Sequence, residues 1–129
     1  MDDDYKKILG IDWGEARIGL ALGDSETKIS SPFKVVDNLF EVLEVIKEEE
    51  IDKIVLGKPV KMSGDKIYLT PAFLKFKKRL EEKANIDIEL LDERLSSKAA
   101  DALPGDKKNK ASRDALAAML ILQDYLDRL

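Results

Sequence analysis

The strongest constraint on the fold is a short apolar run that ends in an acid and a glycine, Ile8-Leu9-Gly10-Ile11-Asp12-Trp13-Gly14. This pattern is typical of a buried strand that delivers a carboxylate to its open end. A lone buried carboxylate is unfavourable unless it is paired or binds a metal ion. Asp12 is therefore the first candidate functional residue.

Two further acids stand in comparable places. Glu93 follows the apolar run Ile88-Glu89-Leu90-Leu91-Asp92, and Asp114 opens the last predicted helix. The 129-residue chain contains no His and no Cys, which excludes a Ser-His-Asp triad, a cysteine nucleophile, thiolate metal sites and disulfides. Three acids at the ends of three elements predict a carboxylate site for hard divalent metal ions.

Each of these acids also has a purely structural interpretation. An Asp at a strand end often caps the following turn, as Asp12 would. Glu93 belongs to an Asp-Glu-Arg run that is also typical of a solvated turn, where an ion pair contributes roughly 0 to 1 kcal/mol. Asp114 would complement the helix dipole, which is worth about 0.3 to 1 kcal/mol. The residues by themselves leave both interpretations open.

Basic residues cluster near the proposed acids. We expect them to hold backbone phosphates, although a solvated surface is the simpler explanation for most of them. The formal net charge of -4 argues against non-specific coating of nucleic acid, yet it leaves room for a local basic face. The candidate substrate-binding residues are Arg17, Lys58, Lys61, Arg94, Lys107, Lys108, Lys110 and Arg113. The run Lys75, Lys77, Lys78 and Arg79 fits the exposed side of a helix better.

Composition predicts one globular domain over residues 1–129. No apolar run approaches the roughly 20 residues that span a membrane, so we expect no membrane partner. The N-terminal run Met1-Asp2-Asp3-Asp4-Tyr5 is acidic, whereas a signal peptide begins with basic residues. We therefore expect a cytoplasmic protein.

The hydrophobic patterns predict an α/β fold with a five-stranded mixed sheet and helices on both faces. Three strands form an antiparallel meander, and two more alternate with helices, so ligand sites are expected at the strand ends. The predicted strands are 5–12, 17–23, 29–36, 53–57 and 86–90, with Pro32 marking an edge strand. The predicted helices begin after the caps Asn38, Thr70 and Ser112, a short helix covers 96–103, and 58–69 is a loop.

Small residues occupy one face of the second predicted strand. Gly19 and Ala21 alternate with larger apolar residues, so this face allows another element to pack closely. Trp13, directly after the first acid, is either a surface aromatic or a residue that stacks on a nucleobase.

Four segments, in order along nearly the whole chain, resemble the motifs of the YqgF-like (RuvX-like) family. The first two are Gly10-Ile11-Asp12-Trp13-Gly14 with Arg17-Ile18-Gly19-Leu20-Ala21, and Val55-Leu56-Gly57-Lys58-Pro59-Val60-Lys61-Met62-Ser63-Gly64. The other two are Asp92-Glu93-Arg94-Leu95-Ser96-Ser97, and Asp114-Ala115-Leu116-Ala117-Ala118 with Ile121-Leu122-Gln123. The second motif departs from the family pattern: Lys58 stands where Leu is common, and Lys61 and Ser63 stand where Asn and Asp are common.

The resemblance implies an RNase H-like fold related to the RuvC-type resolvases. Members are described as Holliday-junction resolvases and as nucleases that mature the 5′ end of pre-16S ribosomal RNA. It implies that Asp12, Glu93 and Asp114 are catalytic acids that bind two Mg²⁺ or Mn²⁺ ions for phosphodiester hydrolysis. The expected products carry 5′-phosphate and 3′-hydroxyl ends. The expected partner is pre-ribosomal RNA or branched DNA, bound by a monomer or a homodimer.

Two alternatives belong to other functional classes. A nucleic-acid or ribosome-assembly binding module without catalysis is compatible with the net negative charge and the altered second motif. Half of a sugar-kinase or actin-like ATPase also begins with an Asp-x-Gly hairpin, but this chain is too short for their two-domain nucleotide cleft.

Overall fold

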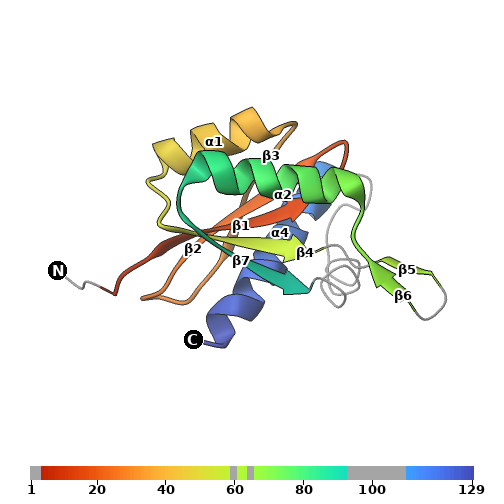
Figure 1. The fold of residues 1–129 in the computed structure, drawn as a ribbon. Helices are drawn as coiled ribbons and strands as arrows, with labels where there is room; N and C mark the ends of the chain where they lie inside the picture. The colour runs from red at the N-terminus through yellow and green to blue at the C-terminus, as the bar shows by residue number, and fades with distance from the viewer. Residues whose placement is uncertain (1–3, 59–60, 64–65, 93–109) are drawn as a thin grey trace.

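The computed structural model describes residues 4–58, 61–63, 66–92 and 110–129. Its centre is a five-stranded sheet with the order β3-β2-β1-β4-β7 (Figure 1). β1, β2 and β3 form the predicted antiparallel meander, and β4 and β7 run parallel to β1. The strands are β1 (Lys7–Trp13), β2 (Ile18–Asp24), β3 (Ser31–Val36), β4 (Lys53–Lys58) and β7 (Asp87–Asp92).

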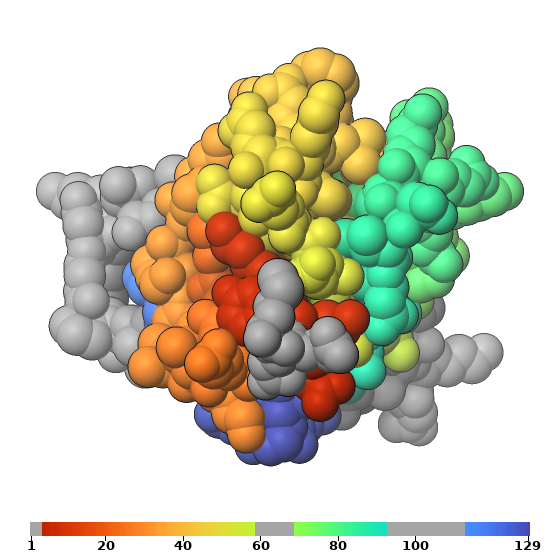
Figure 2. Space-filling model, turned by 90° about the vertical axis from the view of Figure 1, so that its left-hand side faces the viewer, coloured from red at the N-terminus to blue at the C-terminus, as the bar shows by residue number. Residues whose placement is uncertain are grey.

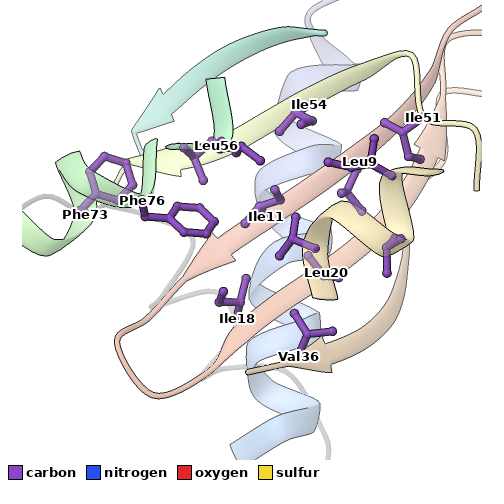
Figure 3. Close-up of a cluster of buried hydrophobic side chains, with 14 residues drawn as sticks. Leu9, Ile11, Ile18, Leu20, Val36, Ile51, Ile54, Leu56, Phe73 and Phe76 are labelled. Carbon is purple, nitrogen blue, oxygen red and sulfur yellow. The ribbon is translucent and has the colours of Figure 1, made fainter. Parts of the chain in front are cut away.

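Helices cover both faces of this sheet, as predicted. α1 (Leu39–Glu48) and α2 (Pro71–Ala84) lie over one face, and α4 (Lys110–Asp127) crosses the other (Figure 1). The larger hydrophobic cluster fills the space beneath α1 and α2 and includes Leu9, Ile11 and Phe73 (Figure 3). The smaller cluster joins α4 to the opposite face through Ile8, Ala21, Val55, Ala118, Ile121, Leu122 and Leu126.

Side-chain caps define the starts of α1 and α2. Asn38 Oδ1 accepts a hydrogen bond of 3.0 Å from the Glu41 backbone N–H. The Glu41 carboxylate reaches back to the Asp37 N–H at 2.6 Å, one residue earlier than in a standard capping box. Thr70 Oγ1 accepts from the Phe73 N–H at 3.3 Å. Both predicted caps are therefore confirmed.

The prediction of a loop over 58–69 is wrong. β5 (Lys61–Ser63) and β6 (Lys66–Tyr68) form a separate antiparallel pair. Ser63 pairs with Lys66, so the connection is the dipeptide Gly64-Asp65, a composition that favours tight two-residue hairpins.

The predicted start of the last helix is also wrong. α4 begins at Lys110, so Ser112 lies inside the helix and is not its cap. Lys110 and Ala111 are good helix formers, which explains why the helix extends past the serine. Asp114 is consequently the fifth helical residue and not part of the first turn. The predicted helix over 96–103 lies outside the described residues.

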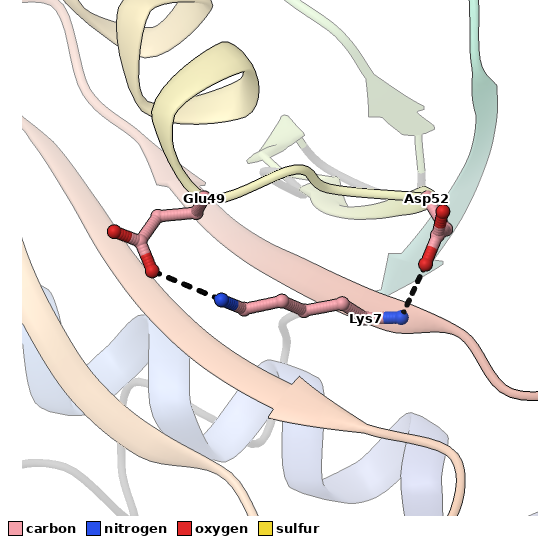
Figure 4. A network of polar contacts seen from close by, with 3 residues as sticks. All are labelled: Lys7, Glu49 and Asp52. Atoms are coloured by element: carbon pink, nitrogen blue, oxygen red, sulfur yellow. Dashed lines mark hydrogen bonds and ion pairs between the residues drawn. The ribbon is translucent and has the colours of Figure 1, made fainter.

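The beginning of β1 is tied to the connection between α1 and β4. Lys7 Nζ lies 3.0 Å from Glu49 Oε1, and the Lys7 N–H donates to Asp52 Oδ2 at 2.8 Å (Figure 4). The Asp52 N–H returns a 2.8 Å bond to the Lys7 carbonyl. Figure 2 views this end of the molecule, where the start of β1 (red) lies beside the α1–β4 connection (yellow).

Within the described ranges, no helix is long and apolar enough to cross a membrane.

Candidate carboxylate site at the end of β1

The alternation of β1 decides which side of the sheet Asp12 faces. Leu9 and Ile11 pack beneath α1 and α2, while Ile8 belongs to the cluster under α4. Because successive strand residues point to opposite faces, Asp12 lies on the α4 face. It is half-buried. The acid is therefore directed away from the large hydrophobic core.

α4 approaches β2 so closely at this point that only glycine fits. A Cβ atom at Gly19 would lie 2.0 Å from the Asp114 carbonyl oxygen and 3.0 Å from the Ala115 nitrogen. Gly19 is also the Cα partner of Asp12 across the β1–β2 ladder. Asp12 and Asp114, 102 positions apart in sequence, thus both adjoin Gly19. This contact confirms the prediction that the small face of the second strand allows close packing.

Arg17 closes the site on the side of the β1–β2 turn. Its carbonyl accepts a 3.0 Å hydrogen bond from the Gly14 N–H, which holds the turn together. Its Nε donates to Asp114 Oδ2 at 2.8 Å, with 42% of the Arg17 side chain and 28% of the Asp114 side chain exposed. An exposed pair of this kind contributes roughly 0 to 1 kcal/mol, so the guanidinium can exchange partners at little cost. We predicted a phosphate-binding role for Arg17, and the sequence did not reveal its pairing with Asp114.

The parallel strands β4 and β7 end at the same edge as β1. Ile11 pairs with Leu56, so Gly57 is the next position of β4 beside Asp12. A glycine there adds no side chain between the ends of β1 and β7. Lys58, half-buried, ends β4 and pairs with Asp92 at the end of β7.

The remaining candidates are only partly covered by the structure. Arg113 is exposed on α4 next to Asp114, Lys110 is the first residue of α4, and Lys61 is the first residue of β5. Glu93, Arg94, Lys107 and Lys108 lie outside the described residues. In the part of the chain that is described, no three acidic side chains form a group that could hold a metal ion. The role of Glu93 as the third acid therefore stays a prediction.

The fold is similar to that of a known resolvase. The structure of T. thermophilus RuvC in complex with Holliday junction substrate matches with a TM-score of 0.58 at 16% sequence identity. The match covers 90% of this chain and 92% of that chain. A second structure of Thermus thermophilus RuvC matches with a TM-score of 0.53 at 14% identity. These likenesses confirm the expected RNase H-like fold.

Curated relatives match the chain over nearly its full length. A protein of Maridesulfovibrio salexigens named "Putative pre-16S rRNA nuclease" is 38% identical, over 95% of this chain and 98% of its own length. A protein of Natranaerobius thermophilus with the same name is 36% identical, over 95% of this chain and 94% of its own length. The family model described as "RuvX: Holliday junction resolvase" matches residues 6–128. The four motifs, the RNase H-like sheet and these matches agree, and the chain belongs to the RuvX (YqgF) family.

Proposed function

We propose that this chain is a metal-dependent endonuclease that works in the cytoplasm as a single RNase H-like domain. Its first candidate role is maturation of the 5′ end of pre-16S ribosomal RNA, and its second is resolution of Holliday junctions. The observation that carries the proposal is that Asp12 and Asp114 both adjoin Gly19 at the end of one strand. The names of the relatives and of the family support a nucleic-acid substrate.

The residues at this strand end fit a divalent cation. Asp114 already accepts a cationic group, the guanidinium of Arg17, at 2.8 Å. The absence of a side chain at Gly19 allows the acid-bearing turn of α4 to lie directly against the sheet. Mg²⁺ and Mn²⁺ prefer oxygen ligands, and we propose that Asp12, Asp114 and Glu93 hold them. Two such ions would supply charge stabilisation for the attacking and leaving oxygens of a phosphodiester.

The cationic side chains have a positioning role in this proposal. Arg17 is a donor whose weak bond to Asp114 leaves it able to turn toward a phosphate. Lys58 stands at the same sheet edge. Contacts with phosphates fix the register of a strand without reading its sequence, which suits an enzyme that recognises shape. The further proposed phosphate ligands are Lys61, Arg94, Lys107, Lys108, Lys110 and Arg113.

The direct test is cleavage of an end-labelled pre-16S ribosomal RNA and of a four-way DNA junction, each with Mn²⁺, with Mg²⁺ and with a chelator. Wild type is compared with Asp12→Asn, which keeps the side-chain shape and removes the charge. We expect metal-dependent cutting that leaves 5′-phosphate ends and is lost in the variant. Symmetric cutting of the junction would further favour a two-fold homodimer over a monomer.

Asp24→Asn is the matched control because Asp24 lies far from the proposed site. It is the strand partner of Lys7 in the β1–β2 ladder, at the opposite end of the hairpin from Asp12. It removes one charge from the same pair of strands and should cut like wild type. We also expect Asp12→Asn to raise the melting temperature of the metal-free protein, because clustered acids repel each other. Cutting that survives in Asp12→Asn, or a marked loss of its metal-free stability, would contradict the proposed site.

The bond between Arg17 and Asp114 favours one alternative, a nucleic-acid binding module without catalysis. An acid that pairs with an arginine can be a structural ion pair and not a metal ligand. That reading predicts equal binding by wild type and Asp12→Asn, with no cutting and no need for Mg²⁺ or Mn²⁺. The same experiment therefore separates the two functions.

A further inference from the structure

A hollow lies at the end of β1 on the face opposite the carboxylate site. Its volume is about 260 Å³, and it opens between the start of α1 and residues 72–79 of α2. Its lining residues are Trp13, Leu39, Ala72, Lys75, Phe76 and Arg79. Trp13 directly follows Asp12, so consecutive residues of one strand contribute to surfaces on opposite sides of the sheet.

The aromatic wall of the hollow is rigidly held. The Trp13 ring meets Phe73 edge to face, with ring centroids 5.7 Å apart, and lies 6.0 Å from the Phe76 centroid. Phe73 is fully buried and Phe76 nearly so, so both belong to the core shown in Figure 3. Trp13 itself is only half-buried. The core therefore fixes an indole ring whose remaining surface faces the hollow.

Two cations stand at the rim of this aromatic surface. Lys75 and Arg79 are four residues apart on α2, which places them on the same side of the helix. Both are exposed, and among the described residues neither forms an ion pair, whereas Lys77 is paired with Glu81 at 2.7 Å. α2 contains no acid before Glu81. The part of this helix before Glu81 is thus a local basic surface on a chain of net charge -4.

We propose that the hollow binds one unpaired nucleotide of the nucleic-acid substrate, with the base stacked on Trp13 and its phosphate held by Lys75 and Arg79. Every nucleobase has a flat face that stacks on an aromatic ring, and its phosphate requires cations nearby. A purely apolar ligand would leave the two cations without a role. If Lys75 and Arg79 were only the solvent-exposed face of α2, they would have no reason to flank a hollow lined by Trp13.

This inference rests on the proposed nuclease function and adds a substrate preference to it. A strand whose phosphodiester lies at Asp12 and Asp114 would pass over the end of β1, and a neighbouring unpaired nucleotide would enter the hollow on the other face. The preferred substrate is then a junction or precursor with an unpaired nucleotide beside the cleaved bond, and not a continuous duplex.

Trp13 is the only tryptophan of the chain, so its fluorescence reports directly on the hollow. The metal-free protein is titrated with a single-stranded oligoadenylate of about eight nucleotides, within the ~4–16 that one single-strand binding fold covers. A blunt duplex with the same number of phosphates serves as the comparison. We expect the single strand to quench the fluorescence by stacking and the duplex to leave it nearly unchanged.

The variants test the cations separately from general attraction. Lys75→Gln with Arg79→Gln should raise the dissociation constant for the single strand about tenfold or more, since two charge-assisted contacts are lost. The slope of log affinity against log salt should fall by about 0.7, because the variant loses its contact with one phosphate and each phosphate contact on a single strand contributes about 0.7. The control Lys78→Gln with Lys83→Gln removes two exposed charges from the same helix outside the hollow and should leave both quantities close to wild type.

Equal weakening by the two double variants, or no quenching by the single strand, would overturn the proposal. Because the titration contains no metal, its outcome is independent of catalysis. If wild type cuts the test substrates but its fluorescence does not respond to a single strand, nucleotide binding in the hollow is refuted and the nuclease proposal stands. If wild type does not cut but the hollow binds as described, the nuclease proposal fails.

Discussion

Replacing Gly19 by alanine tests the contact that brings Asp12 and Asp114 to one place. The new Cβ would lie 2.0 Å from the Asp114 carbonyl oxygen and 2.3 Å from its carbonyl carbon. Ordinary van der Waals contact begins at 3.4 Å, so the α4 backbone would have to retreat by about 1.4 Å. Because both clashing atoms are backbone atoms, no side-chain rotation relieves the overlap.

The expected loss of stability follows from this overlap. Overpacking in a well-packed interior costs about 1 to 3 kcal/mol, and a backbone clash belongs at the upper end. Replacing glycine also reduces the conformational entropy of the unfolded chain, which stabilises the folded state by about 0.4 to 1 kcal/mol. A net loss of about 2 kcal/mol remains. With an unfolding entropy of about 2.1 cal/mol/K per residue, a chain of 129 residues should melt about 7 °C lower.

The assay is urea and thermal unfolding of Gly19→Ala beside Gly23→Ala. At Gly23 the new Cβ would lie 3.1 Å from the side-chain ends of Leu122 and Leu126, which can move, and 3.1 Å from the Ile29 carbonyl oxygen, which has to move by only about 0.3 Å. We expect Gly23→Ala to stay near wild type. At a temperature where both variants are folded, Gly19→Ala should also lose about 100-fold in cleavage, since a shift of about 1 Å can have that effect. Equal stability of the two variants would refute the reasoning.

Three further predictions concern single side chains. Arg17→Gln should tighten Mn²⁺ binding up to about fivefold, because it frees Asp114 from an ion pair worth at most about 1 kcal/mol. The dissociation constant is measured by calorimetry. Weaker Mn²⁺ binding would contradict the idea that Arg17 and a metal ion compete for Asp114. The Thr27 N–H bond holds the pKa of Asp24 below its ordinary 3.8, so this group contributes stability above pH 3.8 that is lost as the pH falls through the lower folded pKa. Asp24→Ala should therefore be more destabilising in urea titrations at pH 7 than below pH 3.8, and a penalty independent of pH would exclude this cause. Thr70→Ala should lower the stability by about 1 kcal/mol and the melting temperature by about 4 °C, and no change would mean that the cap hydroxyl contributes nothing.

Local chemistry made much of the fold predictable from the sequence. The caps Asn38 and Thr70 and the edge strand with Pro32 depend on residues close in the chain, and the structure has all three. The two errors are also local. The prediction over 58–69 passed over Gly64-Asp65 as a hairpin signal, and Ser112 was given a capping role although a serine inside a helix is well tolerated.

The candidate site was predictable only in part, because its geometry depends on contacts between distant segments. Strand alternation and the strand end indicated Asp12, but nothing local indicates that α4 lies against Gly19. The bond between Arg17 and Asp114 joins residues 97 positions apart. The hollow beside Trp13 was missed for the same reason, since the aromatic stripe of α2 looked like core and its lysines like solvated surface.

The register of β1 connects the two proposed surfaces. A slip of one residue would turn Asp12 into the large hydrophobic core and Trp13 toward α4, because side chains alternate along a strand. Two distant features prevent this slip. At the start of the strand, Lys7 is bonded to Glu49 and Asp52 (Figure 4). In its middle, only a glycine at position 10 admits α4, since a Cβ there would lie 2.8 Å from Leu122 Cβ. The placement of the acid on one face and the indole on the other is therefore determined largely by contacts outside either surface.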